Sequence, residues 1–186
     1  MRQTNKIRGD KKLALLHREG AKAFYVYEPT PFSLLYHHFE KMTFSRRVRL
    51  LMEYFSKGRY QVFYLAVEDI LVGHCVAAPG NRRLKRSSRA DMVIGPYFVD
   101  GKYRGNGYAK ELVKWTLETN KGNYRYAYVY IKKNNLPSIK ASTSCGFRPC
   151  GELDIEGFLH NLVERSGGEY TIYQFDPSQN LSALTD

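Results

Sequence analysis

The residues best suited to chemistry lie in one stretch, residues 97–113, with the sequence YFVDGKYRGNGYAKELV. This stretch is predicted to be the end of a β-strand, a turn containing Gly105 and Gly107, and the start of an amphipathic helix. A helix start leaves backbone N–H groups unpaired and carries about half a positive charge, and glycines let an anion approach that backbone closely. Arg104 adds a positive charge beside the turn. The pattern therefore predicts an anion site, and a pyrophosphate would offer several oxygens to its N–H donors.

The spacing of the glycines separates this turn from two common phosphate motifs. A P-loop requires GxxxxGK[ST], which the chain lacks, and in a dinucleotide GxGxxG the third glycine would have to stand where Lys110 stands. The run from Arg104 to Ala109, RGNGYA, instead resembles the [QR]-x-x-G-x-[GA] turn of the GNAT superfamily of acyl-CoA N-acyltransferases, with the apolar Val99 five positions before the arginine. Taken alone, the turn is equally compatible with a strand-to-helix connection that binds nothing.

A second block strengthens the resemblance. Asn135-Leu-Pro-Ser138 opens a predicted short helix that ends at Cys145-Gly146-Phe147, similar to the family's N-x-x-S/A helix ending in GF. Gly95-Pro96 interrupts the preceding strand where that family carries a bulge. The resemblance covers residues 60–175 in good register and 22–58 more loosely. It implies an α+β fold: a mixed, mainly antiparallel central sheet flanked by helices, with a bulged strand before the pyrophosphate-binding helix.

The resemblance also implies roles for individual residues, with acetyl-CoA as co-substrate. Backbone groups of Phe98 and Val99 would pair with the pantetheine arm, and the Val99 N–H would polarise the thioester carbonyl. Asn135 and Ser138 would line the thiol end of the groove, although a helix cap is an equally good interpretation of Asn135. The pyrophosphate would be held by main-chain N–H groups of Arg104, Gly105, Asn106, Gly107, Tyr108 and Ala109.

The chain departs from the family pattern at the general acid. Many members carry a tyrosine seven residues after the asparagine, and Ser142, whose hydroxyl is far less acidic than a phenol, stands there instead. We select Ser142 and Tyr97 as the catalytic candidates. Cys145 is better read as a packed, inert thiol. The other acids considered are a tyrosine among Tyr126, Tyr128 and Tyr130, or solvent, and the bases considered are Glu68, His74, Tyr97 and Asp100.

The elements that must position these residues follow from hydrophobic periodicity. Residues 22–28, 60–67, 70–78, 92–99, 125–131, 147–153, 158–163 and 170–175 are predicted strands, and 30–41, 45–57, 107–120 and 137–144 are predicted helices. Glu68-Asp69 is predicted to close one hairpin and Ser166-Gly167-Gly168 the last one. We expect an N-terminal segment of uncertain structure (1–21), one acyltransferase domain (22–176) and a flexible tail (177–186).

Composition limits the class of protein. A chain of 186 residues has the length of about one domain, because domains average ~150 residues. Its net charge of +11 favours an anionic partner. The basic segment 81–89 is interpreted as a solvated loop rather than a nucleic-acid patch, because no aromatic residues interleave it. Three cysteines without a CxxC pair indicate a reducing cytoplasm and no metal site. No apolar run reaches the ~18 residues of a membrane span, and the N-terminus lacks a secretory signal.

These observations predict an N-acetyltransferase that moves the acetyl group of acetyl-CoA to a primary amine of a polar small molecule, for which an amino sugar is one example. Helices 30–41 and 45–57 and the segment 158–175 are expected to form the acceptor pocket. The paired His37 and His38 suit either that pocket or the surface. Two alternatives stay open: acetylation of a protein or ribosome-associated amine, and a CoA-binding module without turnover. A homodimer is also left open.

Overall fold

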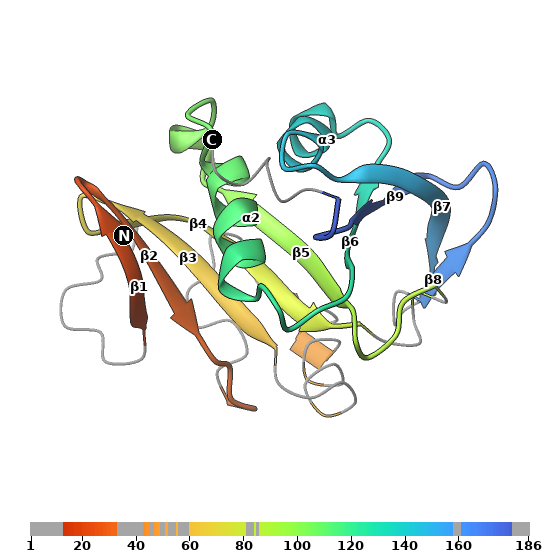
Figure 1. The fold of residues 1–186 in the computed structure, drawn as a ribbon, viewed down its shortest axis with the longest axis horizontal. Coiled ribbons are helices and arrows are strands. Elements are labelled where there is room, and N and C mark those ends of the chain that lie inside the picture. The colour runs from red at the N-terminus through yellow and green to blue at the C-terminus, as the bar shows by residue number, and fades with distance from the viewer. Residues whose placement is uncertain are drawn as a thin grey trace.

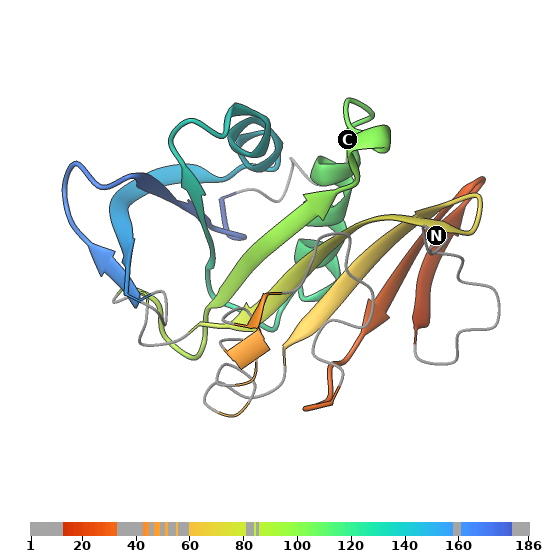
Figure 2. The same ribbon diagram turned by 180° about the vertical axis from the view of Figure 1, so that it is seen from behind.

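The computed structural model describes residues 13–32, 43–44, 47–48, 51, 55, 60–80, 84, 86–157 and 161–179. They form a nine-stranded sheet in the order β1-β2-β3-β4-β5-β6-β9-β7-β8, with two helices against one face (Figures 1 and 2). Within the described residues only the β5–β6 pair is parallel. The predicted α+β class with a mixed, mainly antiparallel sheet is therefore confirmed.

The strands are β1 (Ala14–Glu19), β2 (Lys22–Tyr27), β3 (Gln61–Val67), β4 (Ile70–Pro79), β5 (Met92–Val99), β6 (Ala127–Lys132), β7 (Arg148–Glu156), β8 (Asn161–Glu164) and β9 (Tyr170–Phe175). The helices are the 3-10 turn η1 (Gly101–Tyr103), α2 (Tyr108–Thr119) and α3 (Leu136–Thr143). Each of these strands and helices other than β1 and η1 corresponds to a predicted segment. None of the helices in the described residues is long and apolar enough to cross a membrane.

Helix α2 lies across the middle of the sheet because its apolar residues recur on one face. Leu112, Val113 and Leu117 are buried there, against strands β3 to β5. The opposite face of the sheet carries two separate clusters, one over β2 to β4 and one over β6, β7 and β9. Strand β5 lies between these two clusters, so the two halves of the sheet meet along it.

The first and second predicted helices fall largely outside the described residues. Thr30 forms an isolated bridge, residues 33–41 are not described, and the described residues of 45–57 are helical, starting with a bond from Arg47 N–H to Thr43 O of 3.1 Å. The N-terminal segment, for which the sequence predicts no definite structure, contributes β1 to the edge of the sheet, paired with β2.

Strand β5 contains the predicted bulge. Cys75 pairs with Tyr97 and Ala77 with Ile94, so two residues, Gly95 and Pro96, stand opposite the single residue between them on β4. The Gly95–Pro96 peptide is cis, and Gly95 has φ of 120°. The bulge shifts the alternation of side chains by one residue, so Tyr97 and Val99 join Ile94 on the helix-covered face.

The prediction that Ser166-Gly167-Gly168 closes a hairpin is wrong. Strands β8 and β9 do not pair with each other, because both pair with β7, one on each side. The segment between them crosses β7, where Gly167 N–H donates to the Glu152 carboxylate at 2.5 Å. A side chain on Gly168 would meet the backbone of Leu153, its Cβ only 2.5 Å from the Leu153 carbonyl oxygen. The glycines therefore serve a close crossing over a strand rather than a tight turn.

The basic segment 81–89 is held against the sheet by two described residues. Leu84 is buried with Tyr128, Leu153 and Ile172. The Arg86 guanidinium donates to the Glu164 carboxylate at 2.9 Å and to the Cys150 carbonyl at 2.5 Å. This loop is thus anchored to the β7–β8 hairpin and is more than a solvated connection.

Truncating Leu84 tests this anchor. Because its side chain is 1% exposed, Leu84→Ala should lower the free energy of unfolding by about 2–4 kcal/mol in urea titrations. Leu15→Ala, on β1 at 53% exposure, is the matched control and should change it by about 0.5 kcal/mol or less. Equal losses in the two variants would contradict a buried anchor.

Candidate functional site

The second half of β5 has an unpaired edge. Met92 and Val93 pair with β6, and beyond them the described strands β5 and β6 diverge (Figure 1). The N–H of Asp100 donates to Val72 O on β4 at 2.9 Å. Since backbone direction alternates along an antiparallel pair, the N–H groups of Tyr97 and Val99 point away from β4, toward the unpaired edge. An extended ligand can add to such an edge through main-chain hydrogen bonds.

This register corrects the expectation for Phe98. Its N–H and C=O point toward β4, so Val99 is the residue of the pair whose backbone faces the open edge. The ring of Phe98 stacks on His74, with centroids 6.1 Å apart, on the face away from α2. Phe98 therefore supports the end of the strand through its side chain.

Arg104 clamps the end of the same strand. Its Nε donates to the Val99 carbonyl at 3.0 Å, and its guanidinium carbon lies 5.4 Å from the Phe98 ring centroid. This cation–π contact and hydrogen bond hold the side chain against β5. The Val99 carbonyl is thereby occupied, which leaves the N–H of Val99 as the polar group it presents to the open edge.

The predicted anion cradle lies directly after this clamp. Gly105 and Gly107 have φ of 88° and 78°, a conformation that side chains rarely adopt, and a Cβ at either would meet no atom within 4 Å. The first helical bond of α2 runs from Glu111 N–H to Gly107 O, and no side chain caps the helix. The N–H groups of Tyr108, Ala109 and Lys110 consequently have no partner within the helix. An anion can reach them through the open space over the glycines.

The remaining cradle residue turns inward. The Asn106 amide donates to Tyr103 O at 3.1 Å and to Arg104 O at 3.5 Å. These bonds close the turn from inside, so the Asn106 side chain shapes the cradle. The prediction of a turn from Arg104 to Ala109 that opens a helix is confirmed in its geometry.

A nonlocal ion pair balances the charge at the start of α2. Lys22 of β2 contacts both carboxylate oxygens of Glu111, at 2.8 and 3.0 Å, and its ammonium lies 5.9 Å from the Tyr108 ring centroid. The hydrogen bond with Glu111 raises the pKa of Lys22. Without Lys22, the Glu111 carboxylate would leave an uncompensated negative charge near the anion cradle. Sequence reasoning missed this pair because its members are far apart in the chain.

The second motif block meets β5 beneath α3. The Asn135 side chain accepts from the Ser138 N–H at 3.3 Å, so it caps α3, which was the alternative interpretation of this residue. The Tyr97 hydroxyl donates to the Ser138 carbonyl at 2.8 Å and lies 3.1 Å from the Ser142 Oγ. The two catalytic candidates, chosen separately from the sequence, are therefore in direct contact.

Among the other acid and base candidates, the Cys145 thiol faces the Tyr97 hydroxyl, and the rest have other surroundings. Cys145 is buried, and burial raises the pKa of its thiol to about 11, as expected of an inert side chain. Asp100 accepts from Lys102 N–H and caps η1, while Glu68 is exposed in the β3–β4 turn with φ of 51°. His74 is buried next to Phe98. His37 and His38 lie outside the described residues.

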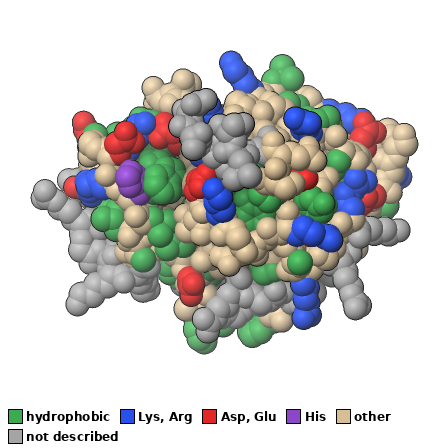
Figure 3. All heavy atoms as spheres, in the orientation of Figure 1, with side chains coloured by type: hydrophobic (Ala, Val, Ile, Leu, Met, Phe, Trp, Pro, Cys, Tyr) green, Lys and Arg blue, Asp and Glu red, His purple; other side chains and the backbone are tan. Residues whose placement is uncertain are grey.

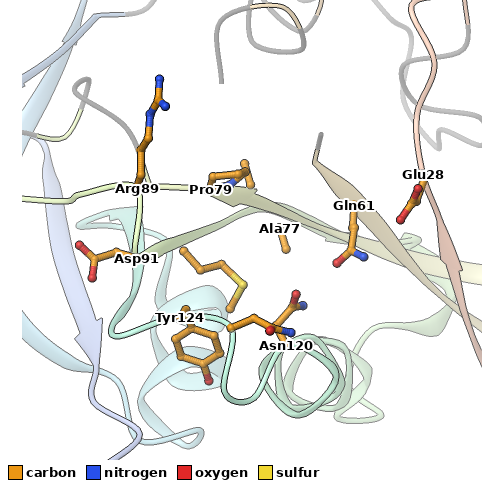
Figure 4. Close-up of a pocket in the computed structure, with 11 residues that line it drawn as sticks. Glu28, Gln61, Ala77, Pro79, Arg89, Asp91, Asn120 and Tyr124 are labelled. Atoms are coloured by element: carbon orange, nitrogen blue, oxygen red, sulfur yellow. The ribbon is translucent and has the colours of Figure 1, made fainter. Parts of the chain in front are cut away.

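A pocket of about 260 Å³ opens at the other end of α2 (Figure 4). Twelve residues separate the two ends of this helix, which is about 18 Å. None of the predicted site residues lines this pocket. Its walls are Glu28, Gln61, Ala77, Ala78, Pro79, Arg89, Asp91, Met92, Asn120, Asn123 and Tyr124. The candidate site is therefore the open edge of β5 with the cradle, not this pocket.

Comparison with known families agrees with this geometry. A model of the Acetyltransferase (GNAT) family matches residues 16–147, which include both motif blocks. The chain belongs to this family. No curated protein sequence matches it.

Solved GNAT-like structures share its fold at low identity. An uncharacterized protein from Bacillus halodurans has a TM-score of 0.62 at 13% identity, covering 95% of this chain and 97% of that chain. Spermidine N-acetyltransferase from Vibrio cholerae, in complex with CoA and spermine, has a TM-score of 0.57 at 14% identity, covering 86% of this chain and 98% of that chain. Ribosomal-protein-S5-alanine acetyltransferase from Vibrio fischeri has a TM-score of 0.56 at 15% identity, covering 88% of this chain and 96% of that chain. These likenesses support the GNAT fold.

The cradle can be tested with two glycines of matched conformation. Gly107→Val should weaken acetyl-CoA binding about tenfold or more by calorimetry, because the side chain fills the space over the N–H groups. Gly122, at φ of 84° after the far end of α2, also has open space around it. Both substitutions should lower the free energy of unfolding by about 1–3 kcal/mol. Gly122→Val should bind acetyl-CoA with the affinity of the native protein. Equal affinities in the two variants would refute the cradle.

The ion pair gives a second test of the same site. Lys22→Met should weaken acetyl-CoA binding about two- to fivefold, the effect of one charge near a helix start. Adding Glu111→Gln should restore the affinity, because the exposed carboxylate is then gone. Arg18→Met, which breaks the exposed pair with Asp69, removes the same charge elsewhere and should leave affinity unchanged. A Lys22 effect that survives Glu111→Gln would contradict this account.

Proposed function

We propose that this GNAT protein is an N-acetyltransferase that moves the acetyl group of acetyl-CoA to a primary amine of a polar small molecule. The observation that carries the proposal is the direction of the Val99 N–H, which points to the unpaired edge of β5. The open cradle follows shortly after it in the chain. The edge offers hydrogen bonds to an extended amide-containing arm, and the cradle offers them to phosphates. Acetyl-CoA carries both groups.

In this proposal the residues divide the work between binding and chemistry. The N–H groups from Arg104 to Ala109 hold the pyrophosphate, and Asn135 and Ser138 lie at the thiol end of the groove. The Val99 N–H donates to the thioester oxygen, a bond that strengthens as negative charge develops there during attack by the neutral amine. Tyr97 and Ser142 supply hydroxyls for proton transfer at the departing sulfur.

The charge distribution favours a small acceptor over a ribosome-bound one. The net charge of +11 would steer the protein to an anionic particle, which is the argument for a protein or ribosome-associated amine. On the face shown in Figure 3, however, Asp and Glu side chains are interspersed among the Lys and Arg side chains. In the basic segment, Arg86 is engaged with Glu164. An amino sugar or another polar amine is therefore the proposed class of acceptor. The proposed location is the cytoplasm, because its reducing conditions keep cysteines such as these three free.

The first experiment measures acetyl-CoA binding by calorimetry and thiol release with glucosamine, spermidine and a peptide with an N-terminal alanine. Binding with turnover on glucosamine supports the proposal, and turnover only on the peptide supports the protein-acceptor alternative. Binding without any turnover supports a CoA-binding module. Absence of acetyl-CoA binding would refute the proposal.

Val99→Pro tests the residue that carries the proposal. Proline removes the N–H that faces the open edge and spares the ladder with β4, since proline is tolerated where no strand pairs. Turnover should fall about 10²- to 10³-fold, the usual loss of one oxyanion donor, while acetyl-CoA still binds. Retained turnover in a folded Val99→Pro protein would contradict the role of this N–H.

A further inference from the structure

We infer that Tyr97 delivers the proton to the departing thiolate and that Ser142 is a positioning residue acting through Tyr97. The inference rests on the proposed function and assigns its general acid. It places the phenol on strand β5, whereas the resemblance points to residue 142 of α3.

Burial differs between the two residues. Ser142 is fully buried, at 0% exposure, so a sulfur atom cannot reach its Oγ without moving α3. Tyr97 is half-buried and lies on the same face of β5 as Val99, two residues before it. Two residues of strand span about 6.6 Å, so the backbones of Tyr97 and Val99 flank the same short section of the open edge.

The hydrogen bonds show which of the two hydroxyls donates to the other. A phenol has one proton, and Tyr97 donates it to the Ser138 carbonyl at 2.8 Å. The 3.1 Å contact between the two hydroxyls is then a bond in which Ser142 donates to the Tyr97 oxygen. A donor aimed at this oxygen stabilises the phenolate that forms when Tyr97 gives up its proton.

The proton balance is complete once the bond to Ser138 is included. As the carbon–sulfur bond breaks, the Tyr97 proton leaves the Ser138 carbonyl and passes to the thiolate sulfur, and the phenolate keeps the bond from Ser142. The acceptor nitrogen loses its proton to water on becoming an amide, and water returns a proton to Tyr97. Free CoA thiol and the acetylated amine are the products.

The surroundings keep Tyr97 protonated until that step. Burial raises its pKa, opposed by the hydrogen bonds with Ser142 and Ser138. The titratable groups that face it are the thiols of Cys75 on β4 and Cys145 after α3, whose pKa values burial raises to about 12 and about 11. Both are neutral at physiological pH, so the phenol has no charged neighbour among them.

A binding experiment tests the assignment without a known acceptor. The affinities of CoA and of desulfo-CoA, which lacks the sulfur, are compared between pH 6.5 and 9.5. If the Tyr97 hydroxyl turns from the Ser138 carbonyl to donate to the bound sulfur, the CoA thiol has a lower pKa when bound than when free. CoA should then gain affinity over desulfo-CoA as pH rises from the bound to the free pKa, by at least threefold.

Variants assign that gain to the two hydroxyls. Tyr97→Phe should abolish it, and Ser142→Ala should reduce it. Tyr124→Phe is the matched control: it removes a tyrosine bond to a backbone carbonyl, Leu117 O at 3.4 Å, at the far end of α2, and should keep the gain. A gain that survives in Tyr97→Phe, or that is missing from the native protein, would overturn the inference.

Turnover on any acceptor found with the native protein gives a second readout. Tyr97→Phe should lower kcat about 10²-fold or more with an unchanged acetyl-CoA affinity, and Ser142→Ala should lower it less. Adding Ser142→Ala to Tyr97→Phe should slow the reaction no further, because Ser142 acts through Tyr97. Additive losses would overturn the inference, whereas failure of the native protein to bind acetyl-CoA would refute the proposed function instead.

Discussion

The bulge at Gly95 and Pro96 is the constraint on which the site depends. One extra residue in β5 shifts the side-chain and backbone alternation of everything after it. With that shift, Val99 directs its N–H to the unpaired edge and Tyr97 extends its ring beneath α3. A regular strand would have turned both toward the wrong side. The divergence of β5 from β6 then leaves that edge accessible to a ligand.

The groups around this edge are held by contacts that leave its donors available. Arg104 occupies the Val99 carbonyl, and Asn106 satisfies carbonyls inside the turn. Lys22 neutralises Glu111, the acidic residue closest to the start of α2. Each contact uses a group that would otherwise compete with, or repel, a phosphate-bearing ligand. The unpaired N–H groups of Val99 and of the first turn of α2 are what remains.

Local signals in the sequence predicted much of this arrangement. The glycine turn, the cap of α3 by Asn135 and the bulge all depend on residues close together in the chain. The turn and the bulge were predicted from it, and the cap was one of the two interpretations of Asn135. The crossing of β7 near Gly168 was mistaken for a hairpin, because glycines serve close backbone approach and tight turns equally well. The Lys22–Glu111 and Tyr97–Ser142 contacts join distant elements, and no local pattern encodes them. Which of Phe98 and Val99 faces the open edge depended on the register with β4, which the bulge alone does not reveal.

A phenol carried by β5 has a mechanical consequence that a helix-borne one lacks. The Val99 N–H and the Tyr97 ring belong to the same strand, and both residues pair with β4, so the separation of their backbones is set by strand geometry. Movement of α3 would change the bonds from Tyr97 to Ser138 and Ser142 but not the backbone spacing of the two residues that we propose to act at the thioester. The helix would hold the phenol hydroxyl and tune its acidity through Ser142, and the strand would fix the point from which the ring extends. Serine is then a suitable residue at position 142, because it is small enough to be fully buried and still supplies the one donor the phenol oxygen can accept.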